Sequence, residues 1–248
     1  MADIISNINK SRGVIKEIFS NEWDTSTIKD LTDDEVFKLY ETKGSELDIG
    51  HAGALMITLN HKFVWGFKMH IVYYNFPQLN TPSTKTTKNF KEKIKRLYDD
   101  DIFSLSDNVV IILNENISET LFKALNSLNV SLELSDSPDG VFEGIKKHHI
   151  KSDHILHKRH FGKAFMFNLL ELTNNLSKNR LVPKHKVIRS EEDIQKVIDS
   201  CNSTKKQLPV ILQNDIMARY NLVVQGDLVE ITRTSKSSGN YNFYRFAR

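Results

Sequence analysis

Cysteine is almost absent from this chain of 248 residues, and proline and glycine are sparse, at 5 and 10 residues. Cys201 is the only cysteine, which excludes a disulfide within the chain and argues against a cysteine-based zinc site. No apolar run approaches the roughly 20 residues of a membrane span. The N-terminus also lacks the basic and then apolar order of a secretory signal. We therefore expect a reduced, soluble protein made in the cytosol, with no membrane partner.

Motifs of the common nucleotide-binding loops and hydrolases are missing as well. The chain contains no GxxxxGKS/T, GxGxxG or GxSxG sequence, so neither a phosphate loop nor a nucleophile elbow is expected. Cys201 has no adjacent histidine and is expected to be a small, half-buried residue. The only Glu-x-Lys triplet, Glu41–Lys43, follows an amphipathic helix, whereas a Mg²⁺-dependent nuclease needs such a pair on a strand. Surface charge at a helix end is the favoured interpretation.

Histidine and basic residues are concentrated in Gly144–Lys163, which carries six Lys and Arg residues against one acidic residue, Asp153. His154 and His157 could share a helical face, and imidazole is a common metal ligand. With so little carboxylate nearby, a solvated basic loop is the first interpretation. A contact with nucleic acid or a partner protein is the second, and a metal site is the weakest. The histidines of this segment are His148, His149, His154, His157 and His160.

Charge is distributed unevenly, although the net charge is only +3. Residues 175–248 hold 13 Lys and Arg against 7 Asp and Glu, a net of +6. Residues 1–174 hold 21 against 24, a net of −3. The first part is therefore not a general polyanion binder, and the last part suits an acidic partner surface.

The first part of the chain alternates helical and strand-like patterns. Thr32 begins a capping box with Glu35, which predicts a helix start. Val109–Leu113 (VVIIL) is an unbroken apolar run, typical of a central strand buried on both faces. Ser118 is placed to cap the helix that follows. The expected elements are helices over Ile4–Phe19, Thr32–Tyr40, Phe90–Tyr98 and Ser118–Leu128, strands over Ala54–Asn60, Phe63–Asn75, Val109–Leu113 and Val130–Leu134, and either form over Ala164–Leu172.

The last third follows the polar stretch Asn174–Asn179, where we expect a domain boundary, with domains at residues 1–174 and 175–248. Asp227–Arg233 and Tyr241–Phe246 alternate at period two, as half-buried strands do. The Ser- and Gly-rich stretch Thr234–Asn240 is expected to connect them as a hairpin. Helices are expected over Ser190–Ser200 and Asp215–Tyr220.

Several separated motifs occur together here: QLP at Gln207–Pro209, DxxARY at Asp215–Tyr220, Gly226 before a strand, RTSKSSGNYNFYR at Arg233–Arg245, and upstream LVPKH at Leu181–His185. In order and spacing they resemble the C-terminal signature of the fifth subunit of eukaryotic nuclear RNA polymerases, a module that archaeal polymerases also carry as one of their subunits. The resemblance spans about Phe167–Arg248. The chain departs from the family pattern at three places: Ile216 replaces a usual proline, Val210 replaces a usual basic residue, and Val223–Gln225 replaces a more basic stretch.

The resemblance implies an α+β chain with two domains. The N-terminal α/β domain would be a jaw with a mixed sheet, similar in fold to restriction endonucleases, and the small C-terminal α+β domain would serve assembly. The implied function is a non-catalytic subunit of a multisubunit DNA-dependent RNA polymerase, without a cofactor. The C-terminal domain would dock on the largest subunit among the other subunits and place the jaw beside downstream duplex DNA. Nucleotidyl transfer would belong to the two largest subunits.

The resemblance also suggests roles for individual residues. Ser118 would lie near DNA, although as a helix cap it needs no phosphate, and Glu119 would repel one. The other residues expected near DNA are Lys123, Lys146 and Lys147. The residues expected to serve subunit assembly are Pro183, His185, Gln207, Leu208, Pro209, Asp215, Arg219, Tyr220, Gly226, Arg233, Ser235, Gly239, Tyr241, Tyr244 and Arg245. Tyr and Arg are expected to matter most, because they predominate at the energetic centres of interfaces.

The source and two other functions stay open. Archaeal versions of the family lack a jaw, so the length points to a eukaryote or a large DNA virus, and the abundance of Asn, Ile and Lys leans toward a virus or a divergent protist. The protein would act in the nucleus if cellular, or in the virion or infected-cell cytoplasm if viral. One alternative is a divergent Mg²⁺-dependent nuclease, which requires converging carboxylates. The other is a stand-alone nucleic-acid-binding module, in which Asn240–Arg248 (NYNFYRFAR) would stack on bases, although half-buried strands give the same pattern.

Overall fold

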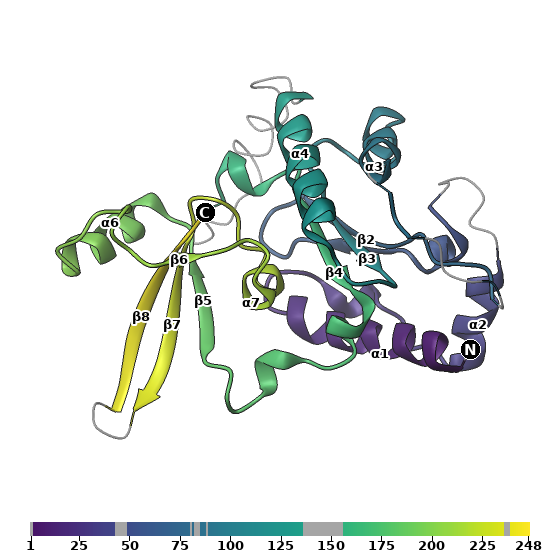
Figure 1. Ribbon diagram of the computed structural model, residues 1–248, viewed down its shortest axis with the longest axis horizontal. Helices are drawn as coiled ribbons and strands as arrows, with labels where there is room; N and C mark the ends of the chain where they lie inside the picture. Colours follow the sequence, from purple (N-terminus) through teal and green to yellow (C-terminus); the bar gives the residue numbers. More distant parts are fainter. Residues whose placement is uncertain are drawn as a thin grey trace. The chain divides into compact units, whose positions relative to one another are not determined.

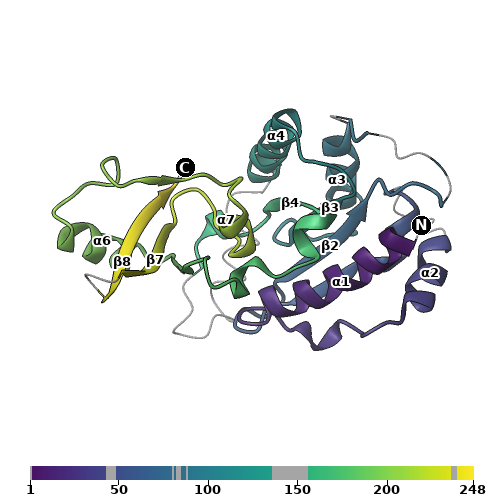
Figure 2. The same ribbon diagram turned by 60° about the horizontal axis from the view of Figure 1, so that its bottom comes forward.

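The computed structural model describes residues 2–42, 49–79, 81, 85–87, 89–135, 156–235 and 239–248. The chain forms two compact units. Residues 1–151 and 161–174 make the N-terminal unit, and residues 152–160 and 175–248 make the C-terminal unit. Each unit combines helices with a four-stranded sheet, so the fold class is α+β, as expected (Figures 1 and 2). Within the described ranges, no helix is both long and apolar enough to cross a bilayer.

A mixed sheet forms the centre of the N-terminal unit, in the order β1-β2-β3-β4. Its strands are β1 (Ile57–Asn60), β2 (Lys68–Tyr74), β3 (Asn108–Leu113) and β4 (Ala164–Asn168). β1 is antiparallel to β2, whereas β2, β3 and β4 are parallel. All six residues of β3 are buried, because a central parallel strand has both faces covered. The prediction for the VVIIL run is confirmed.

Helices cover both faces of this sheet. On one face, α3 and α4 form a core with β2 and β3, in which Ile94, Leu128 and Ile111 are fully buried. α1 lies against the opposite face, where the hydroxyl groups of Ser11 and Tyr73 are 2.9 Å apart. The α-helices of this unit are α1 (Ala2–Phe19), α2 (Asp33–Glu41), α3 (Phe90–Asp99) and α4 (Glu119–Ser135).

A buried polar network ties β1 and β2 to the loop before β3. The ring of His70 contacts the Thr58 hydroxyl through Nδ1 at 3.0 Å and the Asp107 carboxylate through Nε2 at 3.2 Å. Asp107 also accepts hydrogen bonds from the amides of Lys68 and Ser104. A hydroxyl, an imidazole and a carboxylate in line resemble a catalytic relay. However, His70 is only 6% and Asp107 only 3% exposed, so this network is structural.

The C-terminal unit has a sheet in the order β5-β7-β8-β6. Its strands are β5 (Lys184–Ile188), β6 (Val210–Ile211), β7 (Leu228–Ser235) and β8 (Gly239–Ala247). β7 is antiparallel to β5 and to β8, whereas β6 is parallel to β8 and pairs only with Phe246 and Ala247. Its α-helices are α6 (Glu191–Ser200) and α7 (Ile216–Tyr220). Ser190 caps α6 as expected, since its hydroxyl accepts a hydrogen bond from the Asp193 amide.

Each face of this second sheet has its own small core at the base of the β7–β8 hairpin. Successive residues of β7 enter different cores, because strand side chains alternate between faces. The core on the α7 face consists of Ile211, Ala218, Val223, Val229, Ile231 and Ala247. The core on the α6 face consists of Ile194, Ile198, Leu208 and Leu228. Short 3-10 helices elsewhere in the chain occupy Thr25–Thr27, His51–Leu55, Lys158–His160, Leu169–Leu172 and Leu176–Lys178.

The prediction of a strand over Val130–Leu134 is wrong, because α4 continues through it to Ser135. The alternating pattern there also fits a helical stripe, in which Leu125, Leu128 and Leu132 recur at intervals of three and four and are all buried. The fourth strand lies instead in Ala164–Leu172, for which the sequence allowed either form. That strand ends where the Asn168 side chain caps a 3-10 helix by accepting the Leu170 amide.

Strand boundaries differ from the predicted ones beside turns. The strand expected over Phe63–Asn75 begins only at Lys68, after a turn in which Gly66 has a φ of 79°. The strand expected over Ala54–Asn60 begins at Ile57, because a 3-10 helix precedes it. The hairpin connection expected over Thr234–Asn240 is shorter, since Thr234 pairs with Asn240 and Ser235 with Gly239.

The Thr32 capping box allows a direct test of a predicted helix start. The Thr32 hydroxyl accepts the Glu35 amide at 3.3 Å, and the Glu35 carboxylate accepts the Thr32 amide at 2.8 Å. We expect Thr32→Ala to lower the free energy of unfolding by about 1 kcal/mol, because a helix N-terminal amide loses its acceptor. Thr32→Ser keeps the oxygen and should cost less than about 0.5 kcal/mol. Urea unfolding followed by circular dichroism measures both, and equal losses would rule out the hydroxyl as the stabilising group.

Candidate assembly surface

The DxxARY motif forms a capped helical turn. Asp215 precedes α7, and its Oδ1 accepts hydrogen bonds from the amides of Met217 at 2.8 Å and Ala218 at 3.3 Å. These are amides that a helix start leaves without intrahelical partners. Ile216 stands at the first helical position, which needs no amide partner, so replacing the usual proline there leaves the turn intact. The carboxylate of Asp215 therefore serves the fold.

The QLP motif leads the chain into β6. Gln207 Oε1 accepts hydrogen bonds from the Thr204 amide at 2.9 Å and the Thr204 hydroxyl at 3.0 Å. Leu208 is buried in the core beside α6. The Pro209 carbonyl accepts the Phe246 amide at 2.8 Å. The motif thus fixes the end of β8 from outside the hairpin.

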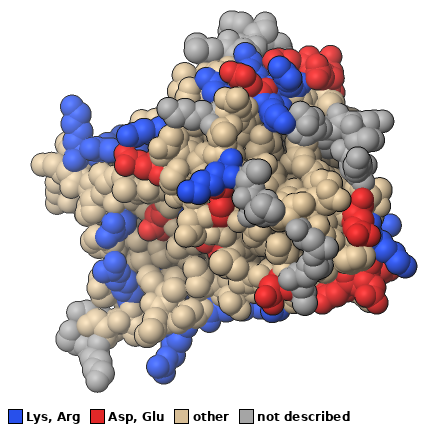
Figure 3. Space-filling view, turned by 45° about the vertical axis from the view of Figure 1, so that its right-hand side comes forward, with Lys and Arg blue, Asp and Glu red and all other residues tan. Residues whose placement is uncertain are grey.

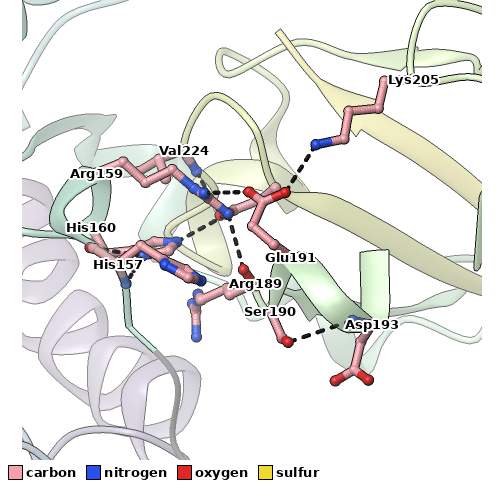
Figure 4. Close-up of polar contacts among 10 residues, drawn as sticks. His157, Arg159, His160, Arg189, Ser190, Glu191, Asp193, Lys205 and Val224 are labelled. Atoms are coloured by element: carbon pink, nitrogen blue, oxygen red, sulfur yellow. Dashed lines mark hydrogen bonds and ion pairs between the residues drawn. The ribbon is translucent and has the colours of Figure 1, made fainter. Parts of the chain in front are cut away.

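Asp227, at the base of the hairpin just before β7, is the centre of a buried polar cluster, and its partners Val224, Arg159 and His160 are labelled in Figure 4. Its side chain is 0% exposed. Oδ2 accepts the Val224 amide at 3.1 Å, and Oδ1 accepts His160 Nε2 at 2.9 Å and both Arg159 Nε and Nη2 at 3.3 Å. A buried carboxylate costs several kcal/mol of desolvation unless it is partnered in this way. The cluster joins the segment Leu156–His160 to the hairpin base within the C-terminal unit.

Arg159 extends this cluster toward the surface (Figure 4). Its Nη1 lies 2.8 Å from the Glu191 carboxylate, and Nη2 donates to the Arg189 carbonyl at 3.0 Å. The other oxygen of Glu191 accepts a hydrogen bond from Lys205 at 2.9 Å. Hydrogen bonds from Lys205 and Arg159 lower the pKa of Glu191, so this carboxylate stays charged at neutral pH. The first residue of α6 is thereby held to the hairpin base.

Burial favours the neutral form of His160 in this cluster. Burial lowers its pKa and outweighs the hydrogen bond to the Asp227 carboxylate, which acts in the opposite direction. The ring is held from both sides: Nε2 lies 2.9 Å from the Asp227 carboxylate, and Nδ1 lies 2.9 Å from the His157 amide and 3.1 Å from the His157 carbonyl.

The outer half of the hairpin presents aromatic and basic side chains on one face. We call the side chains of Arg233, Tyr241, Phe243 and Arg245 the hairpin face. The guanidinium groups of Arg233 and Arg245 lie 4.9 and 5.4 Å from the centre of the Phe243 ring, within the range of cation–π attraction. Tyr241 is 42% exposed and lies opposite Arg233 in the register. The hairpin face is therefore positively charged and partly apolar.

The opposite face of the same hairpin carries a ladder of polar side chains. Asn242 donates to the Glu230 carboxylate at 2.6 Å and lies 3.2 Å from the Thr232 hydroxyl. Thr234 donates to Asn240 at 2.9 Å. These cross-strand pairs stabilise the outer half of the hairpin.

The residues predicted to serve assembly fall into buried, half-buried and exposed groups. Leu208, Arg219 and Tyr220 are buried, at 8%, 6% and 3% exposed, and Arg219 Nε donates to the Asn214 carbonyl at 3.2 Å. Side chains so buried offer little area to a partner. The exposed ones are Gln207, Pro209, Asp215, Arg233, Gly239 and Tyr241, and the half-buried ones are Pro183, His185, Gly226, Ser235, Tyr244 and Arg245.

Two predicted glycines have the backbone conformation that favours glycine. Gly226 has a φ of 95° and Gly239 a φ of 67°. Gly226 lies in the turn before Asp227, and its amide donates to the Ala247 carbonyl at 3.2 Å. A side chain at either position would be strained.

Two of the residues predicted to lie near DNA, Ser118 and Lys123, lie at the start of α4. Ser118 caps α4 by accepting the Leu121 amide at 3.3 Å, and Lys123 pairs with Glu119 at 2.7 Å on the exposed side of that helix. Lys146 and Lys147 lie outside the described residues. On the face drawn in Figure 3, Lys and Arg side chains stand among uncharged and acidic ones and do not gather into one basic field.

Only some of the residues considered for a metal site or a nuclease site lie in the described part of the chain. Glu41 is exposed at the end of α2, and Lys43 falls outside the described residues, as do His148, His149 and His154. Among the residues that the structure does describe, no group of three or more His, Cys, Asp and Glu side chains is arranged to hold a metal ion. His157 and His160 belong instead to the cluster around Asp227.

The buried cluster is what sequence reasoning missed. Asp227 looked like the first residue of a strand, and Arg159 looked like part of a solvated basic loop. The pairing of His160 with Asp227 joins residues 67 positions apart, and no periodicity reports such a contact. The one available signal was the position of Asp227 directly after Gly226, before an apolar strand.

Comparison with known proteins covers the same part of the chain. A family model described as RNA polymerase Rpb5, C-terminal domain, matches residues 174–247. The "DNA-directed RNA polymerase subunit Rpo5" of Methanosphaera stadtmanae is 36% identical over 74 residues, which are 30% of this chain and 95% of the relative. The Rpo5 protein of Aeropyrum pernix is 40% identical over 65 residues, 26% of this chain and 71% of the relative.

In a longer relative, the matched region is again only about a third of this chain. The "DNA-directed RNA polymerases I, II, and III subunit rpabc1" of Dictyostelium discoideum is 38% identical over 79 residues. That region is 32% of this chain and spans only 40% of the relative's length. The family model lies on residues 174–247, the part of the chain that carries the hairpin.

Removing the charge of Asp227 should destabilise the C-terminal unit. We expect Asp227→Asn to lower its free energy of unfolding by about 2–4 kcal/mol, because Arg159 and His160 lose a buried anionic partner. The loss of stability should be smaller than for an ion pair in which both partners are fully buried, since the Arg159 side chain is 24% exposed. Asp199→Asn is the matched control, since Asp199 is exposed and its carboxylate accepts a hydrogen bond from Gln195; it should change stability by less than about 0.5 kcal/mol. Hydrogen exchange of the β7 and β8 amides measures both, and equal protection would contradict the role of the cluster.

His160 should make the C-terminal unit less stable in mild acid. Its folded-state pKa lies below the ordinary value of about 6.5, so the unfolded chain binds the proton more readily. The stabilisation is complete above about pH 6.5 and is lost as the pH falls toward the folded-state pKa, by at most about 1.4 kcal/mol per pH unit. The charged groups around the ring are Asp227, Arg159 and Arg189. His160→Gln should flatten the stability profile between pH 7 and 5.5, and an unchanged slope would assign the effect to another group.

Proposed function

This chain belongs to the Rpb5/Rpo5 family of RNA polymerase subunits, and on that premise we propose that it acts as a subunit of a multisubunit DNA-directed RNA polymerase, docking on the largest subunit through its C-terminal unit. The family is a non-catalytic component of the polymerase. The observation that carries the proposal is that the matched residues, 174–247, are those that build the hairpin and its base. In this scheme the chain supplies a binding surface, and nucleotidyl transfer takes place on other subunits.

The hairpin face is the proposed docking surface. Tyr and Arg are frequent at the energetic centres of interfaces, because they bury a large area and still form hydrogen bonds. Arg233 and Tyr241 are exposed, and the cross-strand contacts hold them in place, so little conformational entropy is lost on binding. The net charge of +6 over residues 175–248 suits an acidic surface, which speeds association more than it tightens binding.

The N-terminal unit is proposed to be a jaw beside downstream DNA, with a fold similar to restriction endonucleases. A mixed sheet with helices on both faces supports this reading. The contact with DNA would be weak and confined to the complex, since residues 1–174 carry a net charge of −3 and Lys123 is already paired. Inside a cell the place of action would be the nucleus; a viral origin would place it in the virion or the infected-cell cytoplasm.

The two units are proposed to be separate domains, with the boundary near residue 174. The grouping of residues 175–248 into one compact unit supports it. Residues 156–160 also group with the C-terminal unit, and Phe161 and the residues after it return to the N-terminal unit and form β4.

Assembly should depend on the exposed side chains of the hairpin face. We expect the double variant Arg233→Ala, Tyr241→Ala to reduce incorporation of the full chain into the polymerase at least tenfold, because two anchors of the interface are removed. Neither side chain belongs to the described cores, so folding should be kept. Phe37→Ala with Lys123→Ala is the matched control, since it removes an exposed aromatic and an exposed cation from the N-terminal unit.

The measurement is co-purification of the tagged full chain with the other polymerase subunits, with folding checked by circular dichroism. A folded hairpin variant that assembles as well as the parent chain would refute the docking surface. A parent chain that recovers no polymerase subunit would refute the function itself.

A further inference from the structure

The geometry points to a second mode of recognition on the C-terminal unit. We propose that the open edge of β8, at Asn240, Asn242 and Tyr244, pairs with an extended acidic segment of a partner subunit, which becomes an added strand of the sheet. This inference rests on the proposed function and names the form of the partner at that site.

The direction of the backbone groups defines the open edge. The Phe246 amide donates to the Pro209 carbonyl on the β6 side, whereas Ala247 exchanges hydrogen bonds with the β7 side through Asp227 and Gly226. Backbone groups in an antiparallel strand alternate between its two sides. The N–H and C=O groups of Asn240, Asn242 and Tyr244 therefore point away from β7. Within the described parts of the chain, no backbone hydrogen bond reaches these groups.

The chain's own sequence prevents β6 from covering this edge. β6 pairs in parallel with Phe246 and Ala247 only. Continuing that register by one step would require the amide of residue 209 to reach the Tyr244 carbonyl. Residue 209 is proline, which has no amide hydrogen. β6 therefore covers only the end of β8, at Phe246 and Ala247, and does not reach Tyr244. An added strand would lie in line with β6, beside Asn240–Tyr244.

The open edge lacks the usual protection against pairing. Exposed edges are commonly blocked by proline, by lysine or by a bulge. Asn240–Tyr244 contains neither residue type, and the register of β7 with β8 is continuous from Leu228–Phe246 to Ser235–Gly239, without a bulge. Asn240 and Asn242 are exposed. Such an edge is suited to strand addition, in which main-chain hydrogen bonds supply affinity and side chains supply specificity.

The positive charge of the hairpin face indicates which kind of strand would pair with the open edge of β8. A strand added beside β8 would place alternate side chains next to the hairpin face, where the guanidinium of Arg245 lies beside the Phe243 ring. Asp or Glu at those positions would be attracted. A second copy of this chain would instead bring two hairpin faces with arginines together, and two units of net charge +6, which is repulsive. We therefore assign the edge to an acidic segment of another subunit.

A proline scan of the edge separates backbone pairing from side-chain contact. Asn242→Pro removes the central outward N–H but no bond to β7, and proline is tolerated in edge strands at such positions. Asn242→Ala is the matched control, because it removes the same side chain and keeps the N–H. Both variants lose the side-chain contacts to Glu230 and Thr232, so we expect Asn242→Pro to lower co-purification with the polymerase at least tenfold relative to Asn242→Ala.

Equal behaviour of the two variants would overturn the proposal, while a tenfold loss in the Arg233→Ala, Tyr241→Ala variant of the same experiment would still uphold the proposed function. If Asn242→Pro fails to fold, the parent chain decides the matter by residue-resolved hydrogen exchange. The amides of Asn240, Asn242 and Tyr244 should exchange rapidly in the free chain and at least tenfold more slowly in the assembled polymerase. Exchange rates that do not change on assembly would overturn the proposal that an acidic partner strand pairs with this edge. Protection in the free chain that grows with protein concentration would also overturn it, because a second copy of the chain would then be the occupant.

Discussion

The C-terminal unit depends on one buried charge that must be neutralised. Asp227 has no contact with solvent, and its carboxylate is held by the Val224 amide, by His160 and by Arg159. These partners come from two segments of the chain, the turn just before β7 and residues 159–160, so satisfying the charge also fixes where β7 begins. Removing water from a carboxylate is so costly that the chain around it has little freedom to rearrange.

The hairpin therefore has a rigid base and an outer half that is available for binding. At the base, Val229 and Leu228 enter cores on opposite faces of the sheet. Beyond those cores, cross-strand pairs such as Thr232 with Asn242 hold the outer half. Binding groups on a supported hairpin lose little entropy when a partner arrives. This division explains how a short family signature can combine structural residues, such as Asp215, with exposed ones, such as Tyr241.

The two units use polar groups in different ways. In the N-terminal unit, His70 and Asp107 close a network inside the fold, and β3 is buried on both faces. In the C-terminal unit, the edge of β8 leaves backbone groups unpaired within the described residues, because Pro209 ends the pairing of β6. The family model of the polymerase subunit matches residues 174–247, which build this second unit's hairpin and its base. The unit with an incomplete sheet is thus the one proposed to bind a partner.

Local chemistry in the sequence determined the caps at Thr32, Ser190 and Asp215, the buried VVIIL strand, and the hairpin with its motif residues, because each depends on neighbours within a few positions. Tertiary structure decided the rest. Val130–Leu134 became helix, since the stripe through Leu132 packs on the sheet, and Arg219 and Tyr220 became buried. The Asp227 cluster joins residues 67 positions apart, and the open edge of β8 follows from which strand stands beside it. Periodicity shows which face of an element is apolar but not which segment will cover it, and that choice is made only when the chain folds.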